Sequence, residues 1–274
     1  MEMLKEGLRV LFDNEQPILA LKKLFPPGKR IGIKPNCVAG IRMSSSSVLC
    51  DAIIELLKLA DTREEEIIIW ERSERELRNA GYPINRSNKG VKVIGNDSPG
   101  GGYTHDFSTY GEVSSLVAKV LTDMVDYHIN LPILKDHSLA GLSGGFKNFY
   151  GAVHNPNKYH DNNCNPYAAD IYCFPEIKNK NRLTVMDCFK IQYNSGPAYN
   201  SKYAVNSNFI LISNDPVALD IIAIEILERL RQSNGLRDLK AENRYPSFLT
   251  TAADENHRLG NCNPDKIEQI EISV

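Results

Sequence analysis

The sequence contains neither paired cysteine motifs nor a long apolar run, and these absences exclude several classes of protein. Its six cysteines are scattered and form no C-x-x-C pair, so a ferredoxin-type iron–sulfur cluster or a zinc ribbon is a poor interpretation. No apolar stretch approaches the roughly 20 residues of a membrane-spanning helix. Lys and Arg number 32 against 34 Asp and Glu, so no basic surplus indicates a nucleic acid or an anionic membrane as a partner.

The rest of the composition is that of an ordinary folded chain. With 274 residues, of which 42% are hydrophobic and 24% charged, it can bury a core without disulfides or metals. This size allows one large domain or two small ones, and we expect a single α/β domain over residues 1–274. The first thirty residues carry charges throughout and lack the uninterrupted apolar segment of a secretory signal, which predicts a cytoplasmic protein.

Strand-like and helix-like patterns alternate along the chain. Short apolar runs next to turn residues predict strands at 30–34, 67–70, 91–94, 128–131, 183–187 and 209–213, and a last one within 267–272. Apolar residues three and four apart predict helices at 48–60, 74–80, 117–124 and 216–231. This alternation predicts an α/β fold with an open, mostly parallel β-sheet, mixed at an edge, and helices on both faces. Residues 130–182 are a candidate lobe over the functional site.

The densest group of reactive side chains follows the predicted strand at 128–131. The chain that leaves this strand delivers Lys135 and His137 at its carboxyl end, and the carboxyl edge of an open α/β sheet is where such folds bind ligands. Gly144 and Gly145 let the backbone approach a ligand closely, and their amides could open a helix whose N-terminus favours an anion. Lys147 then lies in the first turn of that helix.

This group allows three interpretations. His137 could exchange a proton beside a lysine with a depressed pKa, as an acid–base or covalent pair. Alternatively, the lysines and glycine amides could hold a phosphate or carboxylate, with His137 as a hydrogen-bond donor. The third interpretation is a glycine-rich turn with surface lysines and no ligand.

Other polar residues follow strands or flank helices. Lys34 and Asn36 follow the first strand, so they could reach the same edge and complete an anion site with Lys147, and we include Asn148 among the expected contacts. Three acidic residues carry weaker signals. Asp187 is expected to end a strand and Asp215 to cap a helix, and Asp220, further inside that helix, would need a partner such as one of the lysines.

The polar loop at 152–165 is a second source of ligands. His154, His160 and Asp161 could bind a divalent metal such as Zn, Ni or Fe, although solvent exposure alone explains so polar a loop. We favour His160 and Asp161 as pocket residues beside Lys147 and assign no metal ligands.

Four ordered motifs resemble a known family. They are IKPN at 33–36, NLPILKDH at 130–137, GFKNFYG at 145–151 and NDPVALD at 214–220. Together they are similar to the family catalogued as domain of unknown function 362, a bacterial and archaeal group without a settled activity. Many of its members carry ferredoxin-type cysteine motifs or twin-arginine signals, which this chain lacks.

A shorter likeness concerns residues 137–147. This segment is similar to the part of nickel-pincer lactate racemases that holds an active-site histidine and the lysine that attaches the cofactor. The likeness implies that His137 handles a proton or hydride and that Lys147 anchors a cofactor or substrate. The racemase pattern also has a nickel-binding histidine further along, and His160 does not lie at the corresponding spacing.

The leading hypothesis is a protein that binds a small anionic substrate or cofactor. Lys34, Asn36 and Lys147 would bind it, and His137 would be the acid or base of an isomerase-like or racemase-like proton transfer. The alternatives are a noncatalytic ligand-binding or regulatory module and a metal-dependent or iron–sulfur redox protein.

Overall fold

The computed structural model describes residues 1–274 and is built on one eight-stranded sheet and one hairpin. The sheet consists of β1 (Ile31–Pro35), β2 (Ile67–Glu71), β3 (Lys92–Gly95), β6 (Tyr127–Leu131), β7 (Ile133–Lys135), β8 (Asn181–Gln192), β9 (Ala204–Asn206) and β10 (Ile210–Ser213). The hairpin is β4 (Ser108–Tyr110) and β5 (Val113–Ser115).

Nine α-helices surround the sheet. They are α1 (Glu2–Leu11), α2 (Pro17–Leu24), α3 (Ser47–Leu59), α4 (Glu74–Asn79), α5 (Gly145–Asn148), α6 (Tyr167–Tyr172), α7 (Pro175–Lys178), α8 (Pro216–Ser233) and α9 (Phe248–Ala252). None of them combines the length and the apolar composition that a bilayer-spanning helix needs.

The sheet is open and mixed, as the sequence predicts. Its order is β10-β8-β6-β1-β2-β3, and β7 and β9 also pair with β8. The central pairs are parallel, whereas β9 and β10 run antiparallel to β8. The chain builds β1, β2 and β3 outward in one direction and then returns to place β6 on the other side of β1, so the strand order reverses between β1 and β6. A reversal of this kind leaves a crevice at the carboxyl ends of the two strands.

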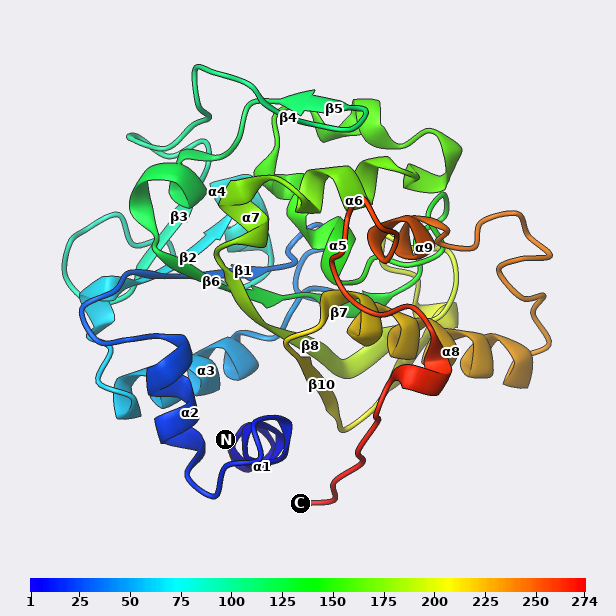
Figure 1. Ribbon diagram of the computed structural model, residues 1–274, viewed down its shortest axis with the longest axis horizontal. Helices are drawn as coiled ribbons and strands as arrows, with labels where there is room; N and C mark the ends of the chain where they lie inside the picture. The colour runs from blue at the N-terminus through cyan, green and yellow to red at the C-terminus, as the bar shows by residue number, and fades with distance from the viewer.

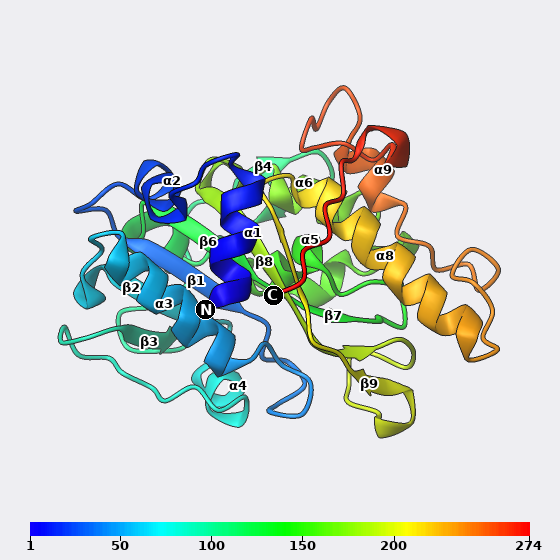
Figure 2. The same cartoon turned by 90° about the horizontal axis from the view of Figure 1, so that it is seen from below.

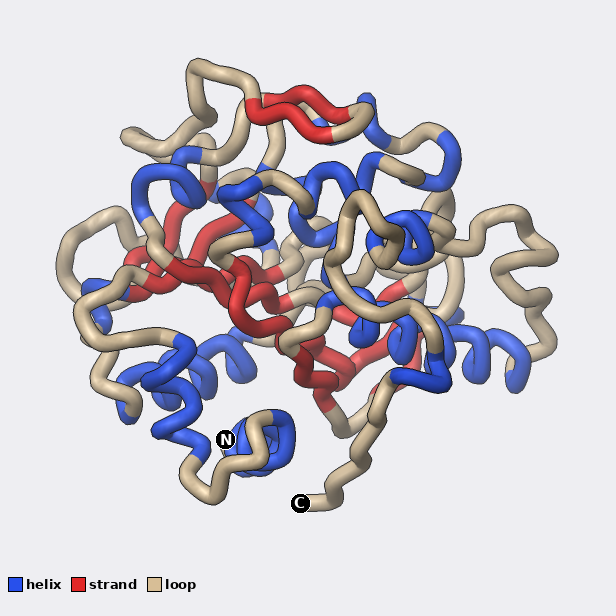
Figure 3. Tube along the Cα trace, viewed as in Figure 1, coloured by secondary structure: helices blue, strands red, loops and turns tan.

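Helices cover both faces of the sheet. In Figure 1, α1, α2 and α3 lie on one side, and α5, α6, α7, α9 and the β4–β5 hairpin lie on the other. Figure 2 gives the view from the side of α1 and α3, and Figure 3 shows the strands between the two helical layers. The apolar run in β2 serves both cores, since Ile67 and Ile69 belong to one cluster and Ile68 and Trp70 to the other. This is the burial expected of a strand covered on both faces.

Several local predictions differ from the structure. Residues 267–272 form no strand, and no partner strand covers them, so their isoleucines do not complete the sheet. The helix expected at 117–124 is a single π-helical turn at Val120–Met124. The strand expected at 183–187 continues to Gln192, so Asp187 lies inside it instead of ending it. The predictions did not include α1 and α2.

Asp215 and the serines before α3 also show how helices begin. The Asp215 carboxylate accepts hydrogen bonds from the amides of Val217 and Ala218, both at 2.9 Å, so it caps α8 as expected. Ser46 is the N-cap of α3, but its side chain makes no capping bond. Instead, its amide donates to Asp187 at 2.7 Å, which ties α3 to the middle of β8.

Candidate functional site

A polar pocket of about 200 Å³ lies at the crevice between β1 and β6. Its walls come from the carboxyl ends of β1, β2 and β7 and from α5 with the turn after it. The lining includes six of the predicted site residues, namely Asn36, Lys135, His137, Lys147, Asn148 and His160. The fold therefore brings together segments more than a hundred residues apart in the sequence.

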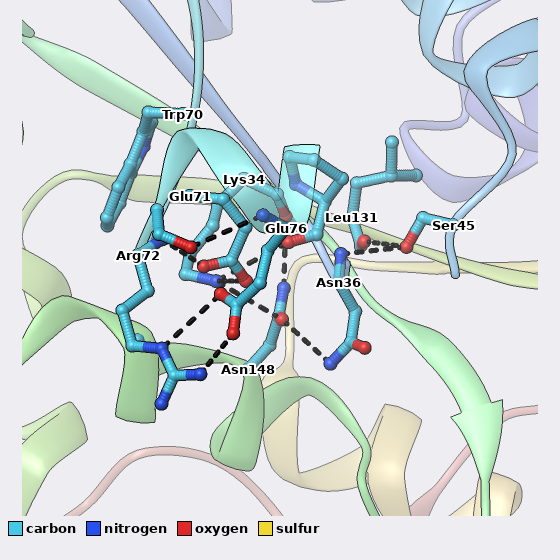
Figure 4. Close-up of polar contacts among 12 residues, drawn as sticks. Lys34, Asn36, Ser45, Trp70, Glu71, Arg72, Glu76, Leu131 and Asn148 are labelled. Carbon is cyan, nitrogen blue, oxygen red and sulfur yellow. Dashed lines mark hydrogen bonds and ion pairs between the residues drawn. The ribbon is translucent and has the colours of Figure 1, made fainter. Parts of the chain in front are cut away.

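The loop after β1 closes one side of this crevice. The Asn36 amide donates to Ser45 Oγ at 2.9 Å, and the Ser45 hydroxyl donates to the Leu131 carbonyl at 2.7 Å. One serine thus joins the carboxyl ends of β1 and β6 (Figure 4). This link fixes Asn36 at the pocket wall.

A buried polar network runs behind the pocket. Lys34 Nζ lies 2.6 Å from Glu71 Oε1 and 3.4 Å from Asn148 Oδ1. Asn36 donates to the same Asn148 oxygen at 3.3 Å and accepts from Lys135 Nζ at 2.9 Å. Figure 4 shows Lys34 between Glu71 and Asn148, with Asn36 beside Asn148. The network therefore connects the carboxylate of β2 to the ammonium of β7.

Lys34 itself belongs to this supporting network. It is completely buried, its charge is paired with Glu71, and it is absent from the pocket lining. Removing either member of a buried ion pair leaves the other charge uncompensated. The structure thus gives Lys34 the part of holding Asn148 in place, in contrast to the predicted direct contact with a ligand.

Lys135 makes no direct ion pair with a carboxylate. Its ammonium donates to Asn36 Oδ1 at 2.9 Å and to the Met43 carbonyl at 3.2 Å and makes no ion pair within 4.0 Å. Burial disfavours the charged form and lowers the pKa of Lys135 to about 8.

Lys147 is held in a similar way on the opposite wall. Its Nζ lies 3.1 Å from His160 Nε2, 3.3 Å from Cys164 Sγ and 3.7 Å from the centre of the Tyr150 ring. None of these groups is a carboxylate, and burial lowers the pKa of Lys147 to about 8.

The backbone fixes the tautomer of His137. The amides of Leu139 and Ala140 both donate to its Nδ1, each at 3.3 Å, so the neutral ring carries its proton on Nε2. Burial, and next the charge of Lys147, lower the pKa of His137 to about 2. The ring is therefore neutral at physiological pH, and it makes no hydrogen bond through Nε2 within the protein. This geometry favours the interpretation of His137 as a hydrogen-bond donor over that of a general base.

Of the three candidate ligands in the loop at 152–165, only His160 lines the pocket. His160 stacks on His137 with ring centres 5.6 Å apart, and its Nδ1 lies 3.1 Å from the Pro156 carbonyl. Its Nε2 is therefore the acceptor that faces Lys147. Asp161 is exposed and outside the lining, and His154 packs on Tyr103. No three His, Cys, Asp or Glu side chains lie together as metal ligands.

The glycine pair contacts an internal carboxylate. Asp220 Oδ1 accepts from the Gly145 amide at 2.7 Å, and Oδ2 accepts from the Phe146 amide at 3.1 Å. A Cβ on Gly144 would lie 2.3 Å from Asp220 Oδ1. The start of α5 does bind an anion, as its sequence indicates, but this anion comes from α8. Gly144 and Gly145 therefore position α5, and Asp220 occupies the amides of Gly145 and Phe146.

Sequence reasoning missed a part of the pocket. Glu71, Arg72 and Glu76 line it from β2 and α4, and Arg72 and Glu76 form an ion pair. Glu71 and Arg72 directly follow the predicted strand at 67–70, so the rule that selected Lys34 and Lys135 would also have found them. Tyr150 and Ser143 also line the pocket and lie within the reactive segment.

The charges of the pocket leave a positive excess. Lys34 pairs with Glu71, and Arg72 pairs with Glu76. Lys135 and Lys147 remain without an acidic partner within 4.0 Å. Two lysines and the Nε2–H of His137 therefore line a pocket formed by mostly buried side chains, where charged hydrogen bonds are strong.

Comparison with known proteins bears on the family and not on the activity. A protein from Thermotoga maritima, whose crystal structure was a target of the Northeast Structural Genomics Consortium, is similar with 13% sequence identity and a TM-score of 0.47. The match covers 86% of this chain and 59% of that one, so this chain spans about three fifths of its length. A search of curated proteins finds no match. The likeness of residues 137–147 to lactate racemases stays a prediction. The family model described as "Domain of unknown function (DUF362)" matches residues 31–225, and the chain belongs to that family.

Proposed function

We propose that the pocket binds a small organic anion and promotes proton transfer next to its carboxylate. The observation that carries this proposal is the pair of buried ammonium groups, Lys135 and Lys147, in one small cavity. Glu71 and Glu76 line the same cavity but pair with Lys34 and Arg72, so neither lysine has an ion-pair partner of its own. Burying a charge without a counter-ion is costly. A bound anion would supply the missing counter-charge to both lysines.

Each polar group of the pocket has a distinct part in this proposal. Lys135, fixed by Asn36, binds the carboxylate. His137 donates its Nε2–H to a neighbouring oxygen, where negative charge develops when a proton leaves the adjacent carbon. Lys147 has a pKa of about 8, close to the pH at which a general base works best. These parts fit an isomerase or a racemase and select no particular substrate.

A noncatalytic binding module is the second candidate, because the same cradle would hold an anion without reaction. The two differ in the effect of His137→Ala. Affinity for the anion should survive the substitution in both cases. Only an enzyme also has turnover, and it should lose that turnover.

Calorimetric titration with oxamate, malonate and inorganic phosphate tests the proposal. We expect at least one of them to bind wild-type protein and the Lys135→Met and Lys147→Met variants to lose about 1.5 to 3 kcal/mol each, roughly 10- to 150-fold in affinity. Lys158→Met is the matched control, since Lys158 is exposed and outside the pocket. Binding that is equally strong in all variants, or absent in wild type, would refute the proposal.

A further inference from the structure

Lys147 has surroundings that suit a nucleophile as well as a base. Its amine is buried, its neighbours are an imidazole nitrogen, a thiol and an aromatic face, and a second ammonium shares the pocket. A lysine that is desolvated in a pocket is one type that attacks carbonyl groups in proteins. Lys135 has a similar pKa but a different environment, because Asn36 and Met43 accept its hydrogen bonds at the pocket wall.

Two neighbours keep the Lys147 amine in place. The Tyr150 hydroxyl donates to the Tyr159 carbonyl at 2.8 Å, which fixes the ring that lies against the amine. His160 donates from Nδ1 to the Pro156 carbonyl, so its Nε2 stays an acceptor toward Lys147 at 3.1 Å. An acceptor in this position can take a proton from the ammonium and return it later.

The rest of the pocket limits the size and polarity of the partner. The cavity is about 200 Å³, and only two of its sixteen lining residues are hydrophobic, so it has no place for an apolar chain. Lys135 can bind a carboxylate, and the Nε2–H of His137 can bind an adjacent oxygen. A carboxylate next to a carbonyl group is the small ligand that uses all three groups.

We infer that Lys147 forms an imine with a small 2-oxo carboxylate, such as pyruvate or glyoxylate, bound through Lys135 and His137. This inference rests on the proposed anion site and names its substrate class. The ammonium passes one proton to His160 Nε2, and the free amine adds to the carbonyl carbon to give a carbinolamine. His160 returns its proton to the hydroxyl, which leaves as water, and a C=N bond replaces the C=O bond. The condensation involves no oxidant or reductant.

Borohydride trapping tests the inference on the full chain. Wild-type protein incubated with pyruvate and then reduced should gain the mass of one pyruvic acid less one oxygen atom. Peptide mapping should place this gain on Lys147. We expect Lys147→Arg to lose the adduct while it keeps the positive charge, and Lys158→Met to keep it. Thermal denaturation of each variant verifies that a missing adduct does not reflect an unfolded protein.

Oxamate separates this inference from the proposed function. It has the shape of pyruvate, but its amide carbonyl does not form an imine. If oxamate binds and competes with pyruvate while no adduct forms on Lys147, the imine is refuted and the anion site stands. If pyruvate and oxamate do not bind and no adduct forms, the imine is refuted, and the proposed anion site fails with it when malonate and phosphate do not bind either. An adduct on Lys135 or on a surface lysine also overturns the inference.

Discussion

At Lys135 the stability of the fold and the binding of a ligand are in conflict. Its ammonium is completely buried and has only neutral acceptors, Asn36 and Met43. A buried charge of this kind destabilises the folded state unless a ligand neutralises it. Residues with this conflict are typical of binding sites, where stability is lower than it could be for the sake of function.

We therefore expect Lys135→Met to fold at least as stably as wild type at pH 7 while it loses affinity for anions. The pKa of Lys135 is lowered from 10.5 to about 8 in the folded protein. Between these values the unfolded chain holds the proton and the folded chain does not, so wild-type stability should rise from pH 8 to pH 10 relative to the variant. Urea denaturation at pH 7 and pH 10 measures both effects. A variant that is less stable by more than about 2 kcal/mol at pH 7 would mean that Lys135 holds the fold together.

His137 should stay neutral over the whole physiological range. Two amides donate to its Nδ1, and its pKa is lowered to about 2, so the Nε2–H tautomer should persist between pH 5 and pH 8. Nitrogen-15 spectra of histidine-labelled protein distinguish the two tautomers and the imidazolium. The spectrum of His137→Gln identifies its signals, and a resonance that titrates between pH 5 and pH 8 would restore the general-base interpretation.

At the scale of elements, α5 begins where α8 supplies a carboxylate. Asp220 is completely buried, and desolvation raises its pKa to about 7 even though it accepts two amides. The helix has only four residues, too few to be stable alone. This contact therefore determines where Lys147 and Asn148 lie.

The two glycines before α5 should tolerate substitution very differently. A Cβ on Gly144 would lie 2.3 Å from Asp220 Oδ1, whereas a Cβ on Gly145 would come no closer than 3.3 Å to any atom. We expect Gly144→Ala to lose about 1 to 3 kcal/mol of stability and Gly145→Ala clearly less. Chemical denaturation of the two variants side by side provides the measurement. Equal losses of stability would show that Asp220 can move away from an added Cβ. The close contact would then not explain why position 144 is a glycine.

The sequence predicted those elements whose signal is local. Apolar runs located β1, β2, β3, β6 and β10, and an amphipathic pattern located α3. Register and partners are not local. The isoleucines of 267–272 do not reveal from their sequence whether another strand pairs with them. The sequence around Asp220 likewise does not reveal that its partner amide lies 75 residues away. For the same reason the sequence predicted Asn36, Lys135 and Lys147 at one edge of the sheet. It did not predict that Lys34 would form an ion pair with Glu71.

At the scale of the whole molecule, the sheet order gathers the charges. The reversal between β1 and β6 places the ends of β1, β2 and β7 around one crevice. The chain as a whole has a formal charge of −2, so the positive excess is local and arises from the fold. A long-range attraction of anions to the protein is therefore not expected, and binding should depend on the pocket itself.

This local origin predicts a specific pH dependence of anion binding. The pKa values of Lys135 and Lys147 are both about 8, so both side chains are charged at pH 6.5 and mostly neutral at pH 9.5. Affinity for a small dianion such as malonate should fall across this range, and binding above pH 8 should take up protons because the anion favours the charged amines.

Calorimetry at pH 8.5 in two buffers of different ionisation enthalpy measures this proton uptake directly. Lys147→Arg is the appropriate control, because an arginine stays charged at every pH used and should remove about half of the uptake. A wild-type affinity that is constant from pH 6.5 to pH 9.5 would mean that neither lysine titrates in this range. In that case burial without a counter-ion would not lower the pKa values of these two lysines.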